Sequence, residues 1–358
     1  MKYILDQKKG NGAHDASGKA MLDVFAIMKS SGVKTVRSIP KNKSKIIRIL
    51  DFPILIFYCI FIFGKNDKCI YVYSDNHLKI KIINAFRHIR GYETVCLIND
   101  IVSSRSCNIY DPHNWEAIKY EFELIGATDV ILAPNEGSIN YMKEHGIKSK
   151  MIPVKVWDYL MDTDPYKEKS YLRKDLTTFD NRKIWKIAFV GNLGKSVFLS
   201  MLNRQEMDCD NLEFHLWGGG CDTEVFSDYK HVVYEGSVAP EEVPEKIAEC
   251  DIGLVWDGDT IFTLDGIIGN YLSFCNSHKF GCYLASGLPL VVCSKSGGAY
   301  FVRETGCGIC IDSLEELGNA LDNIDEETYK QMIEKVKVIS SKIRNGEFLK
   351  EALEKACL

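Results

Sequence analysis

The sequence lacks the features that mark secreted, membrane-spanning and nucleic-acid-binding chains. Its first residues, Met-Lys-Tyr-Ile-Leu-Asp, do not form the charged, apolar and small-residue segments of a signal peptide. The longest apolar run, Phe52 to Phe63, is shorter than the roughly 20 residues that a bilayer-spanning helix needs. A net charge of -5 implies no basic face of the size that nucleic acids require. We therefore expect a cytoplasmic protein with no nucleic-acid partner.

The sequence also has little that could hold a metal ion or form a disulfide. Its thirteen cysteines suit a reducing compartment, so we expect them to be free thiols. Only Cys307 and Cys310 form a CxxC pair, in a glycine-rich turn with no second pair and no nearby histidine. We expect a structural role for this pair and no metal site.

The apolar run from Phe52 to Phe63 has two interpretations. The favoured one is a buried helix that begins near Asp51 and Pro53, because an α/β domain commonly packs such a helix against its sheet. The alternative is peripheral contact with a membrane or a partner, because the run follows four cations that could bind anionic lipid: Lys41, Lys43, Lys45 and Arg48.

The length and composition of the sequence indicate two α/β domains, since a chain of 358 residues that is 46 % hydrophobic is too long for one ordinary core. Short apolar strands alternate with helical patterns, which is typical of doubly wound parallel sheets that bind ligands outside the carboxyl ends of their strands. We expect a first domain over residues 1–157, a linker over 158–182, a second domain over 183–325 and a helical segment over 326–358 that packs across the domains. The expected strands are Lys2 to Leu5, Thr35 to Ser38, Cys69 to Tyr73, Thr94 to Ile98, Val130 to Ala133, Met151 to Ile152, Trp185 to Val190, Leu212 to Trp217, Val232 to Tyr234, Ile252 to Val255, Leu290 to Val292 and Gly308 to Ile311.

Glycine-rich loops follow several strands of the second domain. The first, Phe189-Val190-Gly191-Asn192-Leu193-Gly194-Lys195-Ser196, is an incomplete P-loop, because Phe189 stands where the first glycine of that motif belongs. It predicts a loop leading into a helix, with Lys195 placed to meet a phosphate. Gly236 and Ser237 follow a later strand, where a glycine lets backbone amides approach a ligand. A plain tight turn is the alternative for each loop.

Two further segments carry polar groups to the same edge. Asp257 and Gly258 follow the strand that ends near Val255, where a carboxylate could face the ligand, although a solvated acidic turn is the simpler interpretation. Asn276, Ser277, His278 and Lys279 open an amphipathic helix that Gly287 and Pro289 close. A polar helix N-terminus of this kind is suited to hold an anion, and a phosphate-bearing ligand is the natural guest.

Together these segments resemble a known family. The stretches FVGNLGKS, YEGSVAPEEVPEKI, DIGLVWDG and NSHKFGCYLASGLPLVV follow the order and spacing of a GT-B glycosyltransferase. The chain resembles, more narrowly, the bacterial glucosyltransferases that extend N-acetylglucosamine on serine-rich repeat adhesins, and the related galactofuranosyltransferases. LINDIVSSR and ATDVILAPNEGSINYMKEHGI are similar to the amino-terminal domain of that group, so the likeness covers nearly the whole chain.

The resemblance implies a GT-B fold, in which two Rossmann-like domains face a cleft, and a UDP-sugar donor held mainly by the second domain. It implies transfer of a hexose, glucose or galactofuranose, to a hydroxyl of a glycan or glycoprotein, without a metal ion or other cofactor. Lys279 is the first choice for the diphosphate, because a cation there offsets the charge that develops on the leaving UDP. The residues matched to the nucleotide are Gly191, Asn192, Lys195, Gly236, Ser237, Asn276, Ser277, His278 and Lys279. From their places after strands, we expect Gly12, Ala13, Asp257 and Gly258 to contact the donor sugar or the acceptor.

The acceptor should meet the loop that follows the first strand, where His14 and Asp15 could deprotonate the acceptor hydroxyl. The alternative is that Asp15 only caps the helix expected from Ser17. Many retaining GT-B enzymes carry a Glu-x7-Glu pattern, and only its second glutamate is matched here, by Glu304. The stereochemistry therefore stays open.

A different class of function also fits the pattern, namely a catalytically silent GT-B module that binds a protein or glycan and supports a partner enzyme. Lys195, Asn276 and Lys279 favour the enzyme, because a silent relative is expected to lose its phosphate-facing cations. The resemblance further suggests a homo-oligomer.

Overall fold

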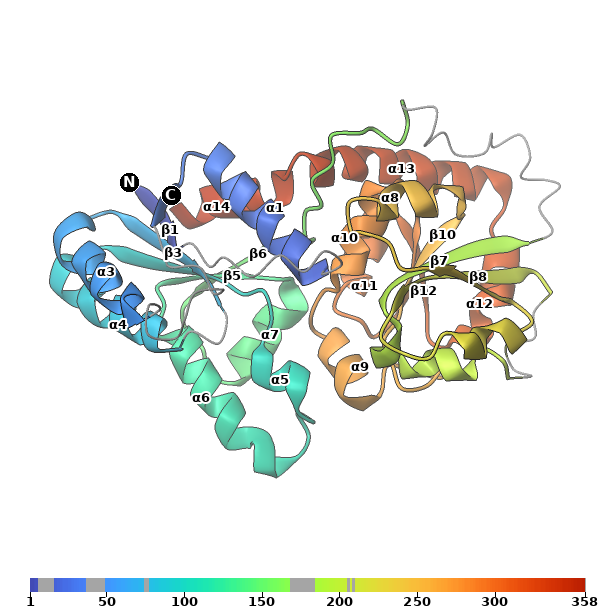
Figure 1. Ribbon diagram of the computed structural model, residues 1–358, viewed down its shortest axis with the longest axis horizontal. Coiled ribbons are helices and arrows are strands. Elements are labelled where there is room, and N and C mark those ends of the chain that lie inside the picture. Colours follow the sequence, from blue (N-terminus) through green and yellow to red (C-terminus); the bar gives the residue numbers. More distant parts are fainter. Residues whose placement is uncertain are drawn as a thin grey trace. The chain divides into compact units, whose positions relative to one another are not determined.

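The computed structural model describes residues 1–5, 16–36, 49–73, 77–167, 184–204, 207 and 210–357. These residues form two compact units, each with its own sheet (Figure 1). Among them, unit 1 contains residues 1–5, 21–155 and 348–357, and unit 2 contains residues 16–20 and 156–347. Residues 158–167 of the expected linker group with unit 2, and the domain boundaries stay a prediction.

The sheet of unit 1 is wholly parallel, with the strand order β2-β1-β3-β4-β5-β6. The chain starts in the middle of this sheet and winds first to one side and then to the other, which creates a switch point between β1 and β3. The residues that directly follow β1, from 6 to 15, lie outside the described residues. The strands are β1 (Lys2–Leu5), β2 (Lys34–Val36), β3 (Lys68–Val72), β4 (Glu93–Leu97), β5 (Val130–Ala133) and β6 (Lys150–Pro153).

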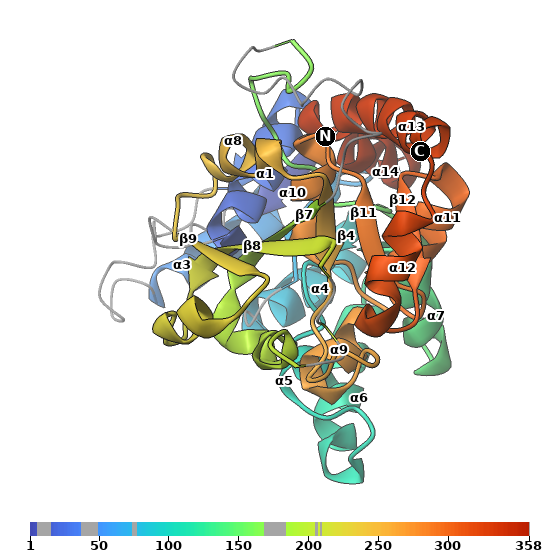
Figure 2. The same cartoon turned by 90° about the vertical axis from the view of Figure 1, so that its right-hand side faces the viewer.

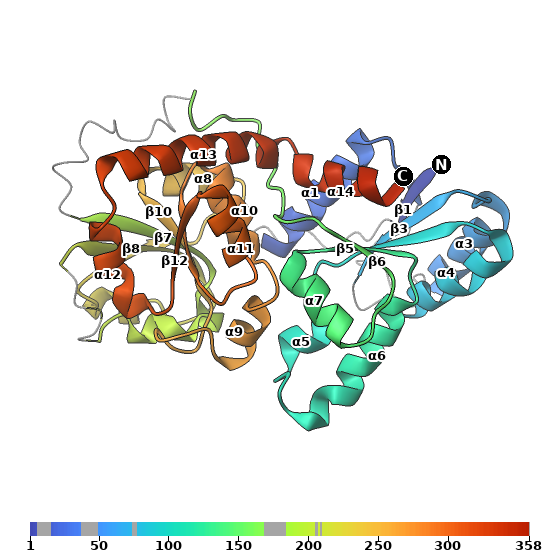
Figure 3. The ribbon, with the colours of Figure 1, turned by 180° about the vertical axis from the view of Figure 1, so that it is seen from behind.

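Helices cover both faces of the unit 1 sheet. Figures 1 and 3 show α1 and α14 on one face and α4, α6 and α7 on the other. The inner strands of the sheet are almost fully buried between these layers, which is why they read as continuous apolar runs in the sequence, whereas the edge strands are partly exposed. The helices are α1 (Ala16–Ser30), α3 (Asp51–Phe57) with the π-helical turn η1 (Tyr58–Ile62), α4 (His77–Arg90), α5 (Val102–Ser106), α6 (Trp115–Gly126), α7 (Glu136–Glu144) and α14 (Glu347–Cys357), with a 3-10 turn at Pro112–Asn114.

The sheet of unit 2 is also parallel, in the order β12-β11-β10-β7-β8-β9. Counted from its first strand, this is the doubly wound order of dinucleotide-binding folds, with a switch point between β7 and β10. Each strand expected from the sequence is confirmed, although residues 37 and 38 of the second expected strand lie outside the described residues. The strands are β7 (Trp185–Asn192), β8 (Leu212–Gly219), β9 (Val232–Gly236), β10 (Ile252–Val255), β11 (Leu290–Cys293) and β12 (Gly308–Ile311).

In unit 2, α10 packs on β10 and β11, and α8 and α13 pack against α10 (Figure 2). The helical segment expected at the carboxyl end consists of two helices, because the chain breaks at Asn345 and Gly346, where Gly346 has φ +71°. The helices are α8 (Val243–Lys246), α9 (Gly266–Leu272), α10 (His278–Ala285), α11 (Ala299–Thr305), α12 (Leu317–Asp322) and α13 (Glu326–Arg344), with 3-10 turns at Leu193–Lys195, Val197–Met201, Glu224–Asp228, Ile247–Glu249 and Leu314–Glu316.

The apolar run from Phe52 to Phe63 forms α3 and η1 but is not the buried helix that the sequence favours. Leu55, Cys59 and Phe63 are buried, whereas Phe57 is 52 % exposed and Phe61 65 % exposed. The run therefore packs one side on unit 1 and leaves an apolar side outward. Across the described part of the chain, no helix combines the length and the apolar character that crossing a bilayer requires.

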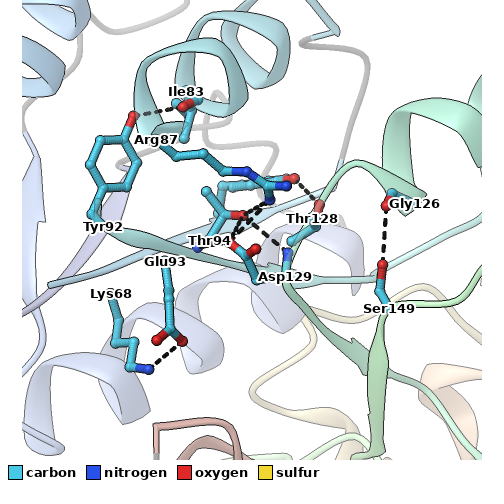
Figure 4. Close-up of polar contacts among 11 residues, drawn as sticks. Lys68, Ile83, Arg87, Tyr92, Glu93, Thr94, Gly126, Thr128, Asp129 and Ser149 are labelled. Atoms are coloured by element: carbon cyan, nitrogen blue, oxygen red, sulfur yellow. Dashed lines mark hydrogen bonds and ion pairs between the residues drawn. The ribbon is translucent and has the colours of Figure 1, made fainter. Parts of the chain in front are cut away.

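A polar network holds the amino-terminal ends of the unit 1 strands together (Figure 4). The Arg87 guanidinium lies 3.0 Å from the Asp129 carboxylate and donates to the Thr94 hydroxyl at 2.9 Å. The Thr94 amide and hydroxyl both donate to Asp129, at 2.8 and 2.9 Å. Nearby, the Tyr92 hydroxyl donates to the Ile83 carbonyl at 2.6 Å. Because ligands bind at the opposite, carboxyl edge of such sheets, we assign this network to stability.

Candidate functional site

The switch point of unit 2 gathers the ends of β7 and β10. From β7 the chain continues to β8 on one side, and from β10 it continues to β11 on the other side. This arrangement brings the end of β7 and the loop after β10 to the same edge of the sheet. Gly191 and Asn192 end β7, and Asp257 lies in the loop after β10. The sequence proposed all three residues for the site, and the topology brings them together.

Helix α10 begins beside this edge. Ser277 is its N-cap, and the Ser277 hydroxyl accepts a hydrogen bond from the Lys279 amide at 3.3 Å. The free amides of the first turn and the aligned peptide dipoles give this end of the helix a positive potential. The helix start expected from Asn276 to Lys279 is therefore present, with a capped N-terminus.

Close packing fixes the position of α10. A side chain at Gly253 on β10 would place its Cβ 2.4 Å from the Tyr283 ring, so only glycine lets the helix approach the strand this closely. A Cβ at Gly281 would lie 2.0 Å from the Trp157 carbonyl oxygen. The Tyr283 hydroxyl also accepts a hydrogen bond from the Val190 amide of β7 at 2.9 Å. Burial raises the pKa of Tyr283 well above its usual value, so the phenol stays neutral in this contact.

The Lys279 side chain extends from the first turn of α10 to the switch point. Its Nζ atom lies 2.7 Å from the Asp257 carboxylate and 4.1 Å from the centre of the Phe189 ring. The Ser196 hydroxyl donates to the same Asp257 oxygen at 3.0 Å. The side chains of Lys279 and Asp257 are only 13 % and 12 % exposed. A cation and an anion are thus held nearly dry at a place where the fold binds ligands.

One glycine lets the backbone of β7 approach this cation, and a second lets β8 approach β7. Gly191 has φ +134°, and a Cβ there would lie 3.1 Å from the Cε atom of Lys279. Gly218 on β8 has φ +139°, and a Cβ there would lie 1.8 Å from the Gly191 carbonyl oxygen. A side chain at either position would be strained, and at Gly218 it would collide with β7. Gly191 therefore leaves room for the Lys279 side chain, and Gly218 keeps β8 close to β7.

Two expectations at this edge need correction. The loop after β7 does not lead into an α-helix, because Leu193–Lys195 and Val197–Met201 are short 3-10 turns, so Lys195 lies on an exposed turn without an α-helical dipole behind it. The solvated turn favoured for Asp257 is also wrong, because its carboxylate is paired and largely buried. The next residue, Gly258, is buried in a tight turn, where a Cβ would lie 2.5 Å from the Thr263 carbonyl oxygen.

The remaining residues expected in the site differ in how close they lie to Lys279. Gly236 ends the edge strand β9, and the exposed Ser237 follows it. Two strand spacings, about 10 Å, separate β9 from β7. Asn276 is half-buried next to the N-cap of α10. Gly12, Ala13, His14 and Asp15 lie outside the described residues.

His278 occupies an aromatic cage that the sequence did not suggest. Its imidazole is stacked on Trp157, with ring centres 6.3 Å apart, and its centre lies 5.9 Å from that of the Tyr159 ring. Burial and the nearby positive charge of Lys19 lower the pKa of His278 to about 4. Among the described residues, the Nε2 atom has no hydrogen-bond partner. His278 is therefore neutral at pH 7 and packs α10 in place without adding charge to an anion site.

Sequence reasoning missed the partners of Lys279. Phe189 and Ser196 both lie in the glycine loop, but their apolar and small polar side chains carry no signal that one contacts Lys279 and the other contacts Asp257, which is paired with Lys279. In the described residues, no group of three or more His, Cys, Asp or Glu side chains is placed to hold a metal ion.

Known proteins resemble the whole chain. The family model of the glucosyltransferase 3-like N-terminal domain matches residues 2–156, and that of the C-terminal domain matches residues 187–356. Beta-1,6-galactofuranosyltransferase WbbI of Escherichia coli (strain K12) is 27 % identical over 351 residues, which is 95 % of this chain and 94 % of the relative. Glucosyltransferase 3 of Streptococcus gordonii is 26 % identical over 255 residues, which is 68 % of this chain and 65 % of the relative.

The fold matches solved structures at low sequence identity. The crystal structure of Anabaena Alr3699/HepE in complex with UDP-glucose has a TM-score of 0.56 at 14 % identity and covers 99 % of this chain and 98 % of that chain. At this identity the match shows the fold alone, and it confirms the expected GT-B class. The curated relatives are named as transferases, which favours catalysis over a silent module. The chain thus belongs to the glucosyltransferase 3-like family and is a glycosyltransferase of the GT-B fold.

Proposed function

We propose that this glycosyltransferase transfers a hexose, glucose or galactofuranose, from a UDP-sugar to a hydroxyl of a glycan or glycoprotein. The names of the two curated relatives support these two sugars, one for each relative. HepE, whose fold is similar, has been crystallised with UDP and with UDP-glucose, which is consistent with a UDP-sugar donor.

The observation that carries the proposal is the position of Lys279 at the switch point of unit 2. Its ammonium group lies between the Asp257 carboxylate and the Phe189 ring, at the capped N-terminus of α10. When a diphosphate binds there, the cation and the helix end would stabilise the charge that the leaving UDP gains as the glycosidic bond breaks. We propose that these groups replace a metal ion in that role.

The other site residues take supporting roles in this proposal. Backbone amides of the glycine loop and of the α10 N-terminus would contact the nucleotide, through Gly191, Asn192, Lys195, Asn276 and Ser277. Gly236 and Ser237 would contact its nucleoside end, because β9 lies farther from the diphosphate position. His278 would hold α10 in place, and Asp257 with Gly258 would border the donor sugar once Lys279 turns toward the phosphates.

The acceptor would bind to unit 1, at the carboxyl edge of its sheet. The switch point between β1 and β3 supports this assignment, since ligands of such sheets bind where the strand order reverses. We propose that His14 or Asp15, in the loop after β1 with Gly12 and Ala13, accepts the proton of the attacking hydroxyl.

A donor panel tests the activity directly. Nucleotide sugars are incubated with the full chain, with and without added EDTA, and hydrolysis and transfer products are identified by mass. We expect UDP release with UDP-glucose or UDP-galactofuranose, a product heavier by one hexose, and no loss of rate with EDTA. Absence of turnover and of UDP binding would refute the proposal, and loss of rate with EDTA would refute the metal-free part.

Calorimetry of UDP binding tests the site itself. We expect Lys279→Met to bind UDP at least about tenfold more weakly, because a charge-assisted contact to phosphate is lost. Since this change leaves Asp257 buried without its partner, the double variant Asp257→Asn/Lys279→Met is the control for folding. The proposed site is wrong if the double variant folds and binds UDP as tightly as the unchanged protein.

Three further expectations stay proposals. A homo-oligomer follows from the resemblance and is tested by light scattering, and a cytoplasmic location is tested by cell fractionation. Peripheral membrane contact would involve the exposed apolar side of α3 and η1 in unit 1.

A further inference from the structure

The helix formed by α3 and η1 presents an apolar face outward from unit 1. Its buried side consists of Asp51, Leu55, Cys59 and Phe63, which recur every fourth residue. The outward side, here called the α3 ridge, has no charged residue among its members. The α3 ridge consists of Ile49, Leu50, Ile54, Phe57, Phe61 and Ile62, which are 61, 55, 36, 52, 65 and 40 % exposed.

The α3 ridge is unusual for the surface of a globular unit. Single exposed apolar side chains are common, but a group of six, four on the helix and two just before it, marks a surface that contacts something apolar. The rings of Phe57 and Phe61 lie 5.2 Å apart and form an aromatic pair on this face. The one charged side chain of the helix, Asp51, is buried and paired with Lys79 at 2.8 Å.

The surroundings of the α3 ridge are cationic. Helix α4 packs beside α3 and η1 and contains no Asp or Glu, but it contains Lys79, Lys81, Arg87 and Arg90. Lys79 and Arg87 are paired with Asp51 and Asp129. In the described residues Lys81 and Arg90 have no carboxylate partner: the Lys81 Nζ atom lies 5.0 Å from the centre of the Tyr120 ring, and Arg90 donates to the Phe63 carbonyl. The chain from residue 34 to residue 90 holds twelve Lys and Arg, three Asp and no Glu, although the whole chain has a net charge of -5.

We propose that the α3 ridge docks on the surface of an anionic lipid bilayer, with its apolar side chains inserted among the upper acyl chains. An apolar helix face bordered by cations is the combination that binds such interfaces. A second copy of this chain fits less well, because self-association through the ridge would bring the cationic segments of both copies together. The proposal is independent of the sugar and the acceptor in the proposed function.

Vesicle co-sedimentation with the full chain tests this docking. We expect binding to phosphatidylcholine vesicles that contain phosphatidylglycerol, weaker binding at high salt, and little binding to phosphatidylcholine alone. Phe57→Ser/Phe61→Ser should reduce the partition constant at least about tenfold, because two exposed aromatic rings no longer enter the bilayer. Lys81→Glu should weaken binding to the anionic vesicles by a smaller factor.

The matched control is Val338→Ser/Tyr300→Ser, which removes two side chains of unit 2 that are 63 and 60 % exposed and should leave binding unchanged. Phe61→Ser alone serves if the ridge double variant does not fold. Absence of binding by the unchanged protein, or equal loss in the control variant, would overturn the proposal. Light scattering that shows a dimer dissociated by the ridge variant, without vesicle binding, would assign the ridge to a second copy instead.

Discussion

At the scale of single residues, the ion pair of Lys279 and Asp257 is a feature that stability alone does not explain. Both side chains are nearly buried, and burying two charges costs about as much as their attraction returns. An apolar pair would hold the fold equally well. The pair is therefore consistent with the proposed role of Lys279 in binding the diphosphate.

A double-variant cycle tests the energetics of this pair. Asp257→Asn alone should lower the free energy of unfolding by about 3 kcal/mol, because it leaves the Lys279 ammonium buried without an opposite charge. Asp257→Asn/Lys279→Met should recover most of that loss. Denaturant unfolding measures each step, and additive losses in the double variant would show that the two side chains are not coupled.

The aromatic cage around His278 predicts a dependence of stability on pH. The pKa of His278 is lowered to about 4 in the folded protein, against about 6.5 for a solvated histidine. Between these values the unfolded chain binds the extra proton, so the contribution of His278 to stability falls as the pH drops from about 6.5 to about 4, by about 3 kcal/mol in total. Below that range the contribution is constant.

The measurement is the difference in the free energy of unfolding between the unchanged protein and His278→Gln, taken at several pH values. The difference cancels the titration of the other groups. From pH 7 to pH 4, the unchanged protein should lose stability relative to His278→Gln. A difference that does not vary over this range would contradict the neutral, buried state of His278.

At the scale of elements, the position of α10 depends on glycines at its contacts. Gly281→Ala would place a Cβ 2.0 Å from the Trp157 carbonyl oxygen, so the helix would have to move away from that segment. We expect weaker UDP binding and a lower melting temperature, since the N-terminus of α10 and Lys279 would move with it. Calorimetry and thermal unfolding measure the two effects.

The matched control for this change is Gly219→Ala, because nothing lies within 4 Å of the Cβ that it adds. This variant should behave as the unchanged protein in both measurements. If Gly281→Ala also binds UDP normally, the close contact of α10 with residue 157 does not position the site.

At the scale of the whole molecule, the two units predict a local response to the nucleotide. UDP alone should slow amide exchange in unit 2 at the end of β7, in the loop after β10 and in the first turn of α10. The amino-terminal network of unit 1 around Thr94 and Asp129 should be unaffected, because it lies away from the ligand edge of its sheet. Hydrogen exchange followed by mass spectrometry measures both, and protection that appears first in unit 1 would contradict the assignment of the nucleotide to unit 2.

The sequence predicted the strands and the fold class well because buried parallel strands leave a local signal. Each is a short apolar run between turn residues, and each strand from Lys2–Leu5 to Gly308–Ile311 was found this way. The start of α10 was also predictable, since Ser277 and the polar residues beside it are a local capping pattern. The break at Gly346 was missed because the apolar spacing continues on both sides of it.

The partners of the site residues were not predictable from local patterns. Asp257 looked like a solvated turn, yet its carboxylate is paired with Lys279, because only the strand order places the end of β10 next to β7 and below the first turn of α10. His278 looked like a ligand residue, yet Trp157 and Tyr159 surround it, far from it in the sequence. Burial of a helix face likewise depends on what lies over it, so the apolar composition of α3 could not reveal that one side is uncovered.

The sequence by itself thus determined the elements, their order and the likeness to a GT-B transferase, since these depend on periodicity and capping along the chain. Only the tertiary structure decided which charges meet, which imidazole is neutral and which apolar side chains stay exposed. Those properties depend on the distance between residues far apart in the chain and on the water that packing removes, neither of which a local pattern contains.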